Sequence, residues 1–351
     1  MTIAGSHPKV GILGAGFVAD VFHMRCFKQL GVDVVAAGTW RGEAGREFTR
    51  KWGIGRLYHG ENAIEQLCAD PEVEFVDIAL PNYLHEKAAI AAAENGKAVA
   101  CEKPLGRSVD EAQRMVDAVR KHSVPDFYAE NQVFAPQVEK VREIVKQGGI
   151  GKVFWVRSRE AHFGPHSKWF WDAGLSGGGV LMDMGCHSIE VARRMIDARP
   201  TEVFAWNATL VHDTKAEDNS LVLVHYANGQ LGQSENSWAA HGGLDLRFEV
   251  YGSEGSAFID VTRETGTRVF TVAPEEKVGY IVEKAEAKKG WLHPISLEHE
   301  MYGYLSEFKH FFDCLQTDQK AMESFEDGLH VNRVIAAAYE SANTRAWTIL
   351  S

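Results

Sequence analysis

The 351-residue sequence predicts an α/β protein, with an N-terminal domain built on a parallel sheet and a C-terminal α+β domain built on an open, mostly antiparallel sheet. Two observations support this prediction. Up to about residue 130, short apolar runs alternate with helical segments, which is typical of βαβ units. From Glu202 to about Val282, strand-like runs follow one another with glycine-containing turns between them. We therefore predict domains at residues 1–130 and 131–351.

In the N-terminal domain, short apolar runs that end in turn residues predict buried strands. The first is residues 9–13, KVGIL, and a helix is expected over 17–30. Further strands are expected at 32–37, 75–80, 98–101 and 126–129, and further helices at 43–52, 63–68, 84–95 and 110–121. The crossovers between parallel strands should be right-handed.

In the C-terminal domain, a strand at 152–162 is expected between helices at 136–147 and 180–196, and helices at 298–316 and 326–345 close the chain. These helices can cover only one face of the predicted sheet. An uncovered apolar face usually marks an interface, so we expect a homodimer or homotetramer joined through the sheet. The residues whose strand-like spacing could supply this face are Val203, Val222, Val224, Phe248 and Val250.

The composition excludes several classes of protein. A net charge of −11 argues against a generally basic surface that binds nucleic acid. The five cysteines are odd in number and form no CxxC pair, which argues against a disulfide framework and a zinc ribbon, and we expect no metal site. No apolar run approaches the ~20 residues that span a bilayer, and the N-terminus lacks the apolar core of a secretory signal. We therefore expect a cytoplasmic protein without a membrane partner.

The first predicted strand runs into a GxGxxA pattern, Gly14-Ala15-Gly16-Phe17-Val18-Ala19. In such a pattern the first glycine allows the tight turn, the second lets the backbone approach a pyrophosphate, and the final small residue keeps the helix close to the strand. The amides at the start of the helix then favour phosphate groups. Because a strand precedes this pattern and a helix follows it, we predict a dinucleotide-binding Rossmann domain.

The end of the second predicted strand reads Gly38-Thr39-Trp40-Arg41. It lacks the acid that commonly binds the ribose 2′-hydroxyl of NAD. We assign Thr39, Trp40 and Arg41 to the cofactor site, where Thr39 can hydrogen-bond a ribose and Arg41 could meet a 2′-phosphate. This favours NADP, although a solvated arginine at a helix start would look the same. Both NAD and NADP are therefore candidate cofactors.

Two short motifs could carry chemistry. The strand at 98–101 ends in Glu102-Lys103-Pro104, and the carboxyl end of a parallel strand is where ligands bind. Lys103 can donate to a substrate hydroxyl and stabilise charge on its oxygen. Asp183 and His187 are four residues apart and would share one helix face, where His187 could transfer a proton and Asp183 could orient it. Taken alone, Asp183 and His187 would ordinarily be interpreted as an acid at a helix start and a buried structural histidine.

Taken together, the blocks GILGAGFVA, ALPNYLHEKAA, CEKPL, YAENQVFAP and GGGVLMDMGCHSIEVA resemble those of the glucose–fructose oxidoreductase / inositol dehydrogenase (Gfo/Idh/MocA) family, in the same order. The resemblance covers about the whole chain. It implies hydride transfer between NAD(P) and a secondary alcohol or ketone carbon of a sugar, polyol or sugar derivative. It also implies that Lys103, Asp183 and His187 form the catalytic triad.

The same resemblance assigns further residues to the cofactor, and these are Pro81, Asn82, His85, Glu102, Lys103 and Asn131. Two departures from the family pattern matter. The second strand has no acid at its end, and Val133 stands where many members have arginine, so that side of the pocket can differ.

The loop at 163–172 leads into the predicted catalytic helix and is rich in aromatic and basic residues. Aromatic faces suit the apolar face of a pyranose, and histidine and lysine can bind hydroxyl or anionic groups. Packing of the tryptophans in the domain core is the alternative. The substrate-binding residues that we predict are Lys103, His162, His166, Lys168, Trp169, Trp171, Asp183 and His187.

Two other functions compete with a sugar or polyol dehydrogenase. A redox-neutral NAD-dependent glycoside hydrolase would oxidise the sugar transiently and eliminate the aglycone, using cofactor only catalytically. A cofactor-binding regulator would have lost the catalytic residues. The presence of Lys103, Asp183 and His187 argues against the regulator.

Overall fold

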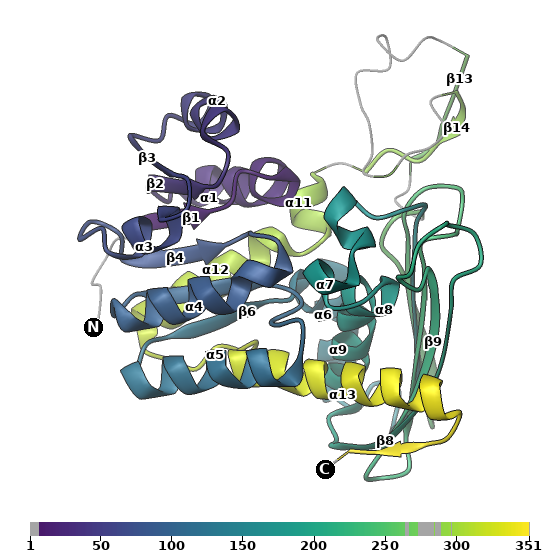
Figure 1. Ribbon diagram of the computed structural model, residues 1–351. Helices are drawn as coiled ribbons and strands as arrows, with labels where there is room; N and C mark the ends of the chain where they lie inside the picture. Colours follow the sequence, from purple (N-terminus) through teal and green to yellow (C-terminus); the bar gives the residue numbers. More distant parts are fainter. Residues whose placement is uncertain (1–6, 264–266, 273–283, 285–288, 296, 351) are drawn as a thin grey trace. The chain divides into compact units, whose positions relative to one another are not determined.

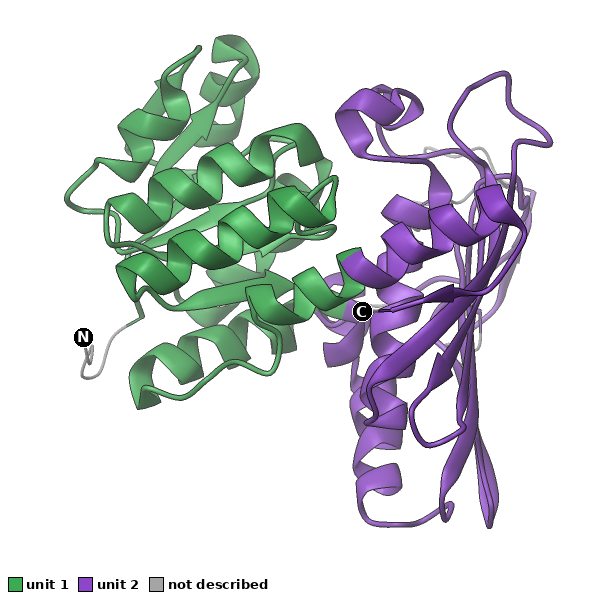
Figure 2. Ribbon diagram, turned by 60° about the horizontal axis from the view of Figure 1, so that its bottom comes forward, with its two compact units in different colours: residues 1–131, 304–332 green, residues 132–303, 333–351 purple. Residues whose placement is uncertain are grey.

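The structure is a computed structural model that describes residues 7–263, 267–272, 284, 289–295 and 297–350. The chain divides into two compact units (Figure 2). Unit 1 comprises residues 1–131 and 304–332, and unit 2 comprises residues 132–303 and 333–351. The first cut is next to the expected domain boundary at 130/131. Residues 304–332, which we expected in the second domain, instead belong to the first unit.

Unit 1 contains a six-stranded parallel sheet in the order β3-β2-β1-β4-β5-β6. The order reverses between β1 and β4, and ligands of open α/β sheets bind at such a switch point. Strand β3 was not expected, because its four residues are only half-buried or exposed and form no apolar run. The strands are β1 Val10–Leu13, β2 Val34–Thr39, β3 Arg56–His59, β4 Phe75–Ile78, β5 Ala98–Glu102 and β6 Asp126–Ala129.

The helices of unit 1 follow the expected alternation, with one difference. The helix expected at 17–30 is a π-helix, η1, at Ala19–His23, continued by α1 at Met24–Leu30. Helices α4 and α5 pack side by side (Figure 1). The remaining helices are α2 Gly42–Trp52, α3 Ala63–Cys68, η2 Asn82–Leu84, α4 His85–Glu94, α5 Val109–His122 and α12 Tyr304–Thr317.

Aromatic packing explains why α12 belongs to unit 1. Three phenylalanines of α12 are fully buried, with 0% exposure each: Phe308, Phe311 and Phe312. The ring centroid of Phe308 lies 4.6 Å from that of Phe27 in α1, and the centroid of Phe312 lies 5.4 Å from that of Phe75 in β4. Burial of a phenylalanine contributes roughly 1.5–3 kcal/mol, so this contact fixes α12 on unit 1. Sequence position alone could not show which sheet this apolar face would cover.

Unit 2 contains a seven-stranded sheet in the order β12-β11-β7-β10-β9-β8-β15. Only β7 and β10 pair in parallel, so the sheet is mostly antiparallel, as predicted. Part of the run expected to reach Val282 forms β13, which pairs with β14 in a separate two-stranded sheet, and 273–283 lie outside the described residues. The strands are β7 Val153–Ala161, β8 Pro200–Ala208, β9 Asn219–Tyr226, β10 Leu231–Ser237, β11 Asp245–Gly252, β12 Gly255–Asp260, β13 Val269–Thr271, β14 Gly290–Leu292 and β15 Thr348–Ile349.

Helices lie against one face of this sheet, where α9 contacts β7 and β10 (Figure 2). The helix expected at 180–196 is two helices, α8 Val180–Asp183 and α9 Gly185–Ile196, with Met184 between them. Helix α13 contributes residues 325–332 to unit 1 and residues 333–344 to unit 2. Helix α13 as a whole spans Phe325–Thr344. The other helices with residues in unit 2 are η3 Asn131–Phe134, α6 Pro136–Lys146, η4 Lys168–Trp171, α7 Ala173–Ser176 and α11 Glu298–Met301.

The apolar face that we predicted for assembly is on the covered side of the sheet. All five predicted residues are at most 2% exposed within the single chain: Val203, Val222, Val224, Phe248 and Val250. The assignment of these residues to an uncovered face is therefore wrong. Alternation with period two separates the two faces of a strand, but it does not identify which face the helices cover.

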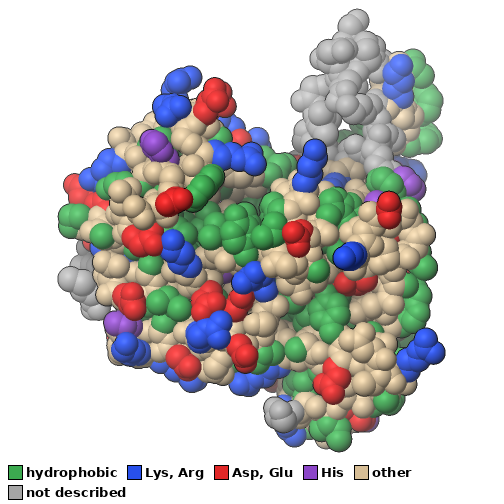
Figure 3. Space-filling model, in the orientation of Figure 1, with side chains coloured by type: hydrophobic (Ala, Val, Ile, Leu, Met, Phe, Trp, Pro, Cys, Tyr) green, Lys and Arg blue, Asp and Glu red, His purple; other side chains and the backbone are tan. Residues whose placement is uncertain are grey.

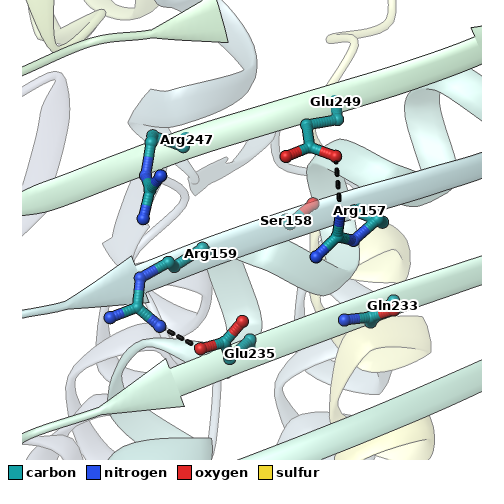
Figure 4. Close-up of a pocket in the computed structure, with 7 residues that line it drawn as sticks. All are labelled: Arg157, Ser158, Arg159, Gln233, Glu235, Arg247 and Glu249. Atoms are coloured by element: carbon teal, nitrogen blue, oxygen red, sulfur yellow. Dashed lines mark hydrogen bonds and ion pairs between the residues drawn. The ribbon is translucent and has the colours of Figure 1, made fainter. Parts of the chain in front are cut away.

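The opposite face of the sheet combines an apolar half with a charged half. On β8 and β9, Trp206 is 50% exposed and Leu221 is 37% exposed. On β7, β10 and β11, ion pairs join neighbouring strands, with Arg157 Nη1 2.8 Å from Glu249 Oε2 and Arg159 paired with Glu235 (Figure 4). Cross-strand pairs of opposite charge stabilise a sheet, so these ion pairs support the charged half of this face.

The surface agrees with the charge balance of the sequence. On the face drawn in Figure 3, basic and acidic side chains are interspersed among the described residues. None of the helices in the described part of the chain combines the length and the apolar character needed to span a bilayer.

Candidate active site

The glycine-rich loop of unit 1 contains one glycine that the fold requires and one that the fold does not require. Gly14 has φ +118°, and a Cβ there would lie 2.2 Å from the carbonyl oxygen of Ala79, so only glycine fits. A Cβ on Gly16 would meet no atom within 4 Å. Glycine at position 16 therefore leaves free space beside an exposed backbone, which is the property a bound pyrophosphate needs. Ala19 is fully buried where the π-helix begins, as its predicted packing role requires.

The residues after β2 are open to solvent. Thr39 is the last residue of β2, Trp40 is 64% exposed, and Arg41 is exposed at the residue before α2. A 2′-phosphate or a ribose could therefore reach Thr39 or Arg41 without displacing packed side chains. Within the loop before these residues, Phe17 is 41% exposed, whereas Val18 is half-buried.

His85 joins two of the predicted cofactor loops rather than facing solvent. Its ring is 1% exposed, with Nδ1 2.9 Å from the carbonyl oxygen of Pro104 and Nε2 2.8 Å from that of Leu80. Burial lowers the pKa of His85, so the ring is neutral and donates one of these hydrogen bonds at a time. This contact links the turn after β4, which contains Pro81 and Asn82, to the turn after β5. His85 therefore helps to fix the positions of both turns.

The turn after β5 holds the Glu-Lys-Pro motif. The Lys103–Pro104 peptide is cis, the isomer that a proline at this turn allows. The carboxylate of Glu102 is 8% exposed, and its Oε2 accepts a hydrogen bond of 3.1 Å from the backbone N–H of Lys103. The side chain of Lys103 is only partly buried. Asn131, at the end of unit 1, is 4% exposed in the short helix η3 that follows β6.

Behind Glu102 lies a histidine that the sequence analysis did not select. His23 is fully buried at the end of η1, with Nδ1 2.8 Å from Asp77 Oδ2 and Nε2 2.9 Å from Glu102 Oε1. Burial alone would lower the pKa of His23, but the two carboxylates raise it to about 10. Two polar residues inside apolar segments, Asp77 in FVDI and His23 in DVFHM, were the sequence signal that could have revealed this cluster.

In unit 2, Asp183 and His187 belong to successive helices. Asp183 is the last residue of α8 and His187 lies in the first turn of α9; the two are 4% and 7% exposed. The indole Nε1 of Trp238, itself fully buried, donates to Asp183 Oδ2 at 3.2 Å. The thiol of Cys186 lies 3.1 Å from the carbonyl oxygen of Asp183. Asp183 is therefore held from both its side chain and its backbone.

A second acid fixes the start of α8. Glu217 Oε1 accepts from the backbone N–H groups of Gly179 and Leu181 at 3.0 and 3.1 Å, and from the hydroxyl of Tyr339 at 2.7 Å. These amides have no partner within the helix, so the carboxylate satisfies donors that would otherwise be lost. A Cβ on Gly179 would lie 2.1 Å from the carbonyl oxygen of Glu217, which explains the glycine there. The sequence analysis missed Glu217, because no local pattern links residue 217 to the glycine triplet.

The predicted substrate residues of unit 2 fall into a buried and an exposed group. His162 is 2% exposed, and burial lowers its pKa well below the usual value, so its ring is neutral. The carboxylate of Asp183 is close enough to oppose this shift. The ring of His166 lies 5.0 Å from that of His162, but the residue is exposed. Lys168 is exposed as well.

The two tryptophans of the loop differ in their packing. Trp171 is half-buried, with its ring 5.2 Å from Trp238 and 4.8 Å from His212. Trp169 stacks on Phe170 at 3.8 Å. Trp171 therefore packs against the residue that donates to Asp183 and still presents part of its ring. The structure thus brings Trp171, Trp238, Asp183 and His162 into one neighbourhood of unit 2.

Comparison with known proteins matches both parts of the chain. Residues 8–129 match a family model described as the oxidoreductase family with an NAD-binding Rossmann fold, and residues 138–258 match the GFO/IDH/MocA C-terminal domain. Myo-inositol 2-dehydrogenase of Thermotoga maritima is 30% identical over 327 residues, which cover 91% of this chain and 92% of that protein. The uncharacterized oxidoreductase YrbE of Bacillus subtilis is 31% identical over 279 residues, which cover 78% and 77%.

A solved structure extends the comparison to three dimensions. GenD2 from gentamicin A biosynthesis, in complex with NAD, superimposes with a TM-score of 0.91 and 27% sequence identity, covering 100% of this chain and 99% of that chain. The similarity therefore includes both units and the whole length of each protein.

Proposed function

The chain belongs to the GFO/IDH/MocA family of NAD-binding oxidoreductases, and we propose that it moves a hydride between the nicotinamide and a secondary alcohol or ketone carbon of a sugar, polyol or sugar derivative. The observation that carries the proposal is the presence of Lys103 directly after β5, Asp183 at the end of α8 and His187 in the first turn of α9. Hydrogen bonds hold the backbone of Lys103 and the carboxylate of Asp183. The neutral, buried His162 beside Asp183 suits hydroxyl groups better than a charged substrate.

We assign one role to each residue. The ammonium of Lys103 holds the reacting oxygen and stabilises the charge that develops there. The imidazole of His187 takes the proton of the hydroxyl, since the usual pKa of histidine, about 6.5, lies near working pH. Asp183, held by Trp238, keeps the imidazole or a neighbouring hydroxyl in place. Bound NAD supplies the acceptor for the hydride. In the alternative assignment, Lys103 is the main proton carrier and His187 only binds substrate.

The substrate class rests on the relatives and on the loop. One relative is named a myo-inositol 2-dehydrogenase, and inositol is a cyclic polyol. In this chain, Trp171 presents part of an aromatic ring beside Trp238, and Lys168 and His166 add exposed polar groups. We propose that these side chains contact the sugar.

We propose that NADP is accepted besides NAD. No acid follows β2, and the exposed Arg41 could pair with a 2′-phosphate. The Arg41→Ala variant should lose binding of NADP more than binding of NAD, and equal losses would contradict this assignment.

We also propose a cytoplasmic homodimer or homotetramer. All five cysteines are buried free thiols, as a reducing compartment permits. The face for assembly is the exposed one that contains Trp206 and Leu221, in place of the five buried residues first expected. Light scattering of wild type and Trp206→Arg should show an oligomer that the substitution weakens, and a monomeric wild type at micromolar concentration would overturn the idea.

The reaction is tested with a panel of sugars, polyols and sugar acids, each offered with NAD⁺ and NADP⁺ while the absorbance of reduced cofactor is followed. Stoichiometric reduced cofactor with a free sugar supports the dehydrogenase, whereas release of an aglycone without net reduction shows the glycoside hydrolase. Saturating dinucleotide at a hundredfold excess over Kd should stabilise the chain by about 2.7 kcal/mol. The Gly16→Leu variant should fold but lose this gain, because its side chain meets only the space beside the backbone.

A further inference from the structure

His23 connects two strands of unit 1 through a single imidazole ring. Its Nδ1 faces Asp77 of β4 at 2.8 Å, and its Nε2 faces Glu102 of β5 at 2.9 Å. All three side chains are buried, with exposures of 0% for His23 and Asp77 and 8% for Glu102. The histidine comes from η1, a π-helical turn directly after the glycine-rich loop, and such turns occur frequently at functional sites.

Both contacts require a proton, which determines the charge of the cluster. A neutral imidazole has one N–H, whereas two carboxylate partners need two. Burial of the ring opposes protonation, yet Asp77 and Glu102 raise the pKa of His23 to about 10, so the ring is an imidazolium. The nearby carboxyl of Glu307 is fully buried, and burial raises its pKa well above the usual value, so it stays neutral. One cation therefore lies between two carboxylates.

The contact with Glu102 leads directly to the proposed catalytic lysine. Glu102 uses Oε1 toward His23 and Oε2 toward the backbone N–H of Lys103. Rotation of the carboxylate would break one of these two contacts. The imidazolium thus fixes the plane of the carboxylate, and the carboxylate fixes the peptide that carries the Lys103 side chain.

We propose that His23 is a positioning residue, which orients Lys103 for hydride transfer through Glu102. This role rests on the proposed function of Lys103. The residue itself touches neither substrate nor cofactor in this scheme. The proposal differs from a purely structural role because it assigns the effect on kcat to the hydrogen bond between Nε2 and Glu102. The hydrogen bond between Nδ1 and Asp77 has no such effect in this proposal.

Two substitutions of His23 each keep one of the two hydrogen bonds of the ring and remove the other. The amide of His23→Gln reaches the place of Nε2 and keeps the contact with Glu102, whereas the amide of His23→Asn reaches the place of Nδ1 and keeps the contact with Asp77. Both variants lose the positive charge and one hydrogen bond, so both should lose comparable stability. His23→Asn should lower kcat by about 10²-fold, because a displacement of about 1 Å at the reacting group costs that much. His23→Gln should keep most of the wild-type kcat.

A matched control measures the cost of disturbing the surrounding core. Phe27 follows one turn after His23 and packs on the same Phe308 ring, but its side chain has no group that could hydrogen-bond a carboxylate. Phe27→Leu should lower the unfolding midpoint while the ratio of kcat to that of wild type stays close to one. If kcat follows the unfolding midpoint across Phe27→Leu, His23→Gln and His23→Asn, the role of His23 is structural and the proposal is overturned.

A second readout does not depend on turnover. Peptide mass spectrometry measures how fast an amine-reactive ester acylates Lys103 in the intact protein, relative to the exposed Lys28. This ratio of rates reports the environment of the Lys103 side chain. This ratio should change severalfold in His23→Asn and stay at the wild-type value in His23→Gln. An active wild type with equal ratios and equal kcat in both variants overturns the positioning role. An inactive wild type with a changed ratio in His23→Asn overturns the proposed function alone.

Discussion

The two units support their chemical residues with different interactions. In unit 1, the turn that carries Lys103 is anchored by a buried cation between two carboxylates, His23 between Asp77 and Glu102. In unit 2, the segment that carries Asp183 is anchored by an indole N–H from Trp238 and by backbone amides that donate to Glu217.

This difference has energetic consequences. Breaking a buried ion pair by removing one partner costs about 3–5 kcal/mol, because a charge is left buried without compensation. Removing one hydrogen bond from an uncharged donor to a carboxylate costs about 1.5–3 kcal/mol. The support of unit 1 should therefore be the stronger, the more cooperative and the more sensitive to pH.

The largest effect should come from the chemical residues themselves, one from each unit. Lys103→Ala and His187→Ala should each lower kcat by about 10²–10⁴-fold, the range typical of acid–base groups. In His187→Ala the decline of rate at acid pH should disappear, leaving kcat low but flat. Steady-state kinetics over a pH series measure both. A His187→Ala variant with near-wild-type kcat and only a raised KM would move the proton transfer to Lys103.

The next effect compares the two anchors directly. His23→Leu leaves the fully buried carboxylate of Asp77 without a positive partner and should cost about 3–5 kcal/mol of unfolding free energy. Tyr339→Phe removes the hydroxyl that donates to the Glu217 carboxylate and should cost about 1.5–3 kcal/mol. Denaturant unfolding of both variants beside wild type gives the two values. Equal losses would show that charge does not distinguish the anchor of unit 1.

The sequence could reveal an anchor only where its contacting residues lie close together along the chain. The GxGxxA loop, the strand before it and the Glu-Lys-Pro turn follow from local patterns, and the structure has them where predicted. The cluster around His23 joins segments 54 and 79 residues away, and Glu217 caps a helix 38 residues earlier. No periodicity encodes such contacts. For the same reason, the sequence could not show that Phe308, Phe311 and Phe312 pack on unit 1.

A third effect concerns pH, and its sign differs between the units. The folded pKa of His23, about 10, lies above the unfolded value of about 6.5, so its stabilisation is complete below pH 6.5 and is lost as the pH rises toward 10. In this window the unfolding free energy should fall by up to about 1.4 kcal/mol per pH unit. For His162, burial lowers the folded pKa, so stability is present above about pH 6.5 and is lost as the pH falls below it.

Unfolding curves at a series of pH values test both signs. His23→Gln should remove the decline on the alkaline side and leave the acid side unchanged. His162→Gln should do the reverse, because it removes the group that must be neutral in the folded chain. If His23→Gln leaves the alkaline decline intact, the imidazolium is not the group responsible, and the comparison between the units loses its electrostatic basis.

The smallest effect should come from the anchor of unit 2, in which uncharged donors hold a carboxylate. Trp238→Phe keeps an aromatic ring against Trp171 but removes the N–H that donates to Asp183 at 3.2 Å. A distance of 3.2 Å is long for such a bond, so we take the low end of the range for a carboxylate acceptor, about 1.5 kcal/mol, which corresponds to roughly a tenfold fall in kcat. In an Asp183→Asn background the same substitution should have a smaller effect on kcat, because the carboxylate that received the hydrogen bond is gone. Additive losses in the double variant would show that Trp238 acts through packing alone.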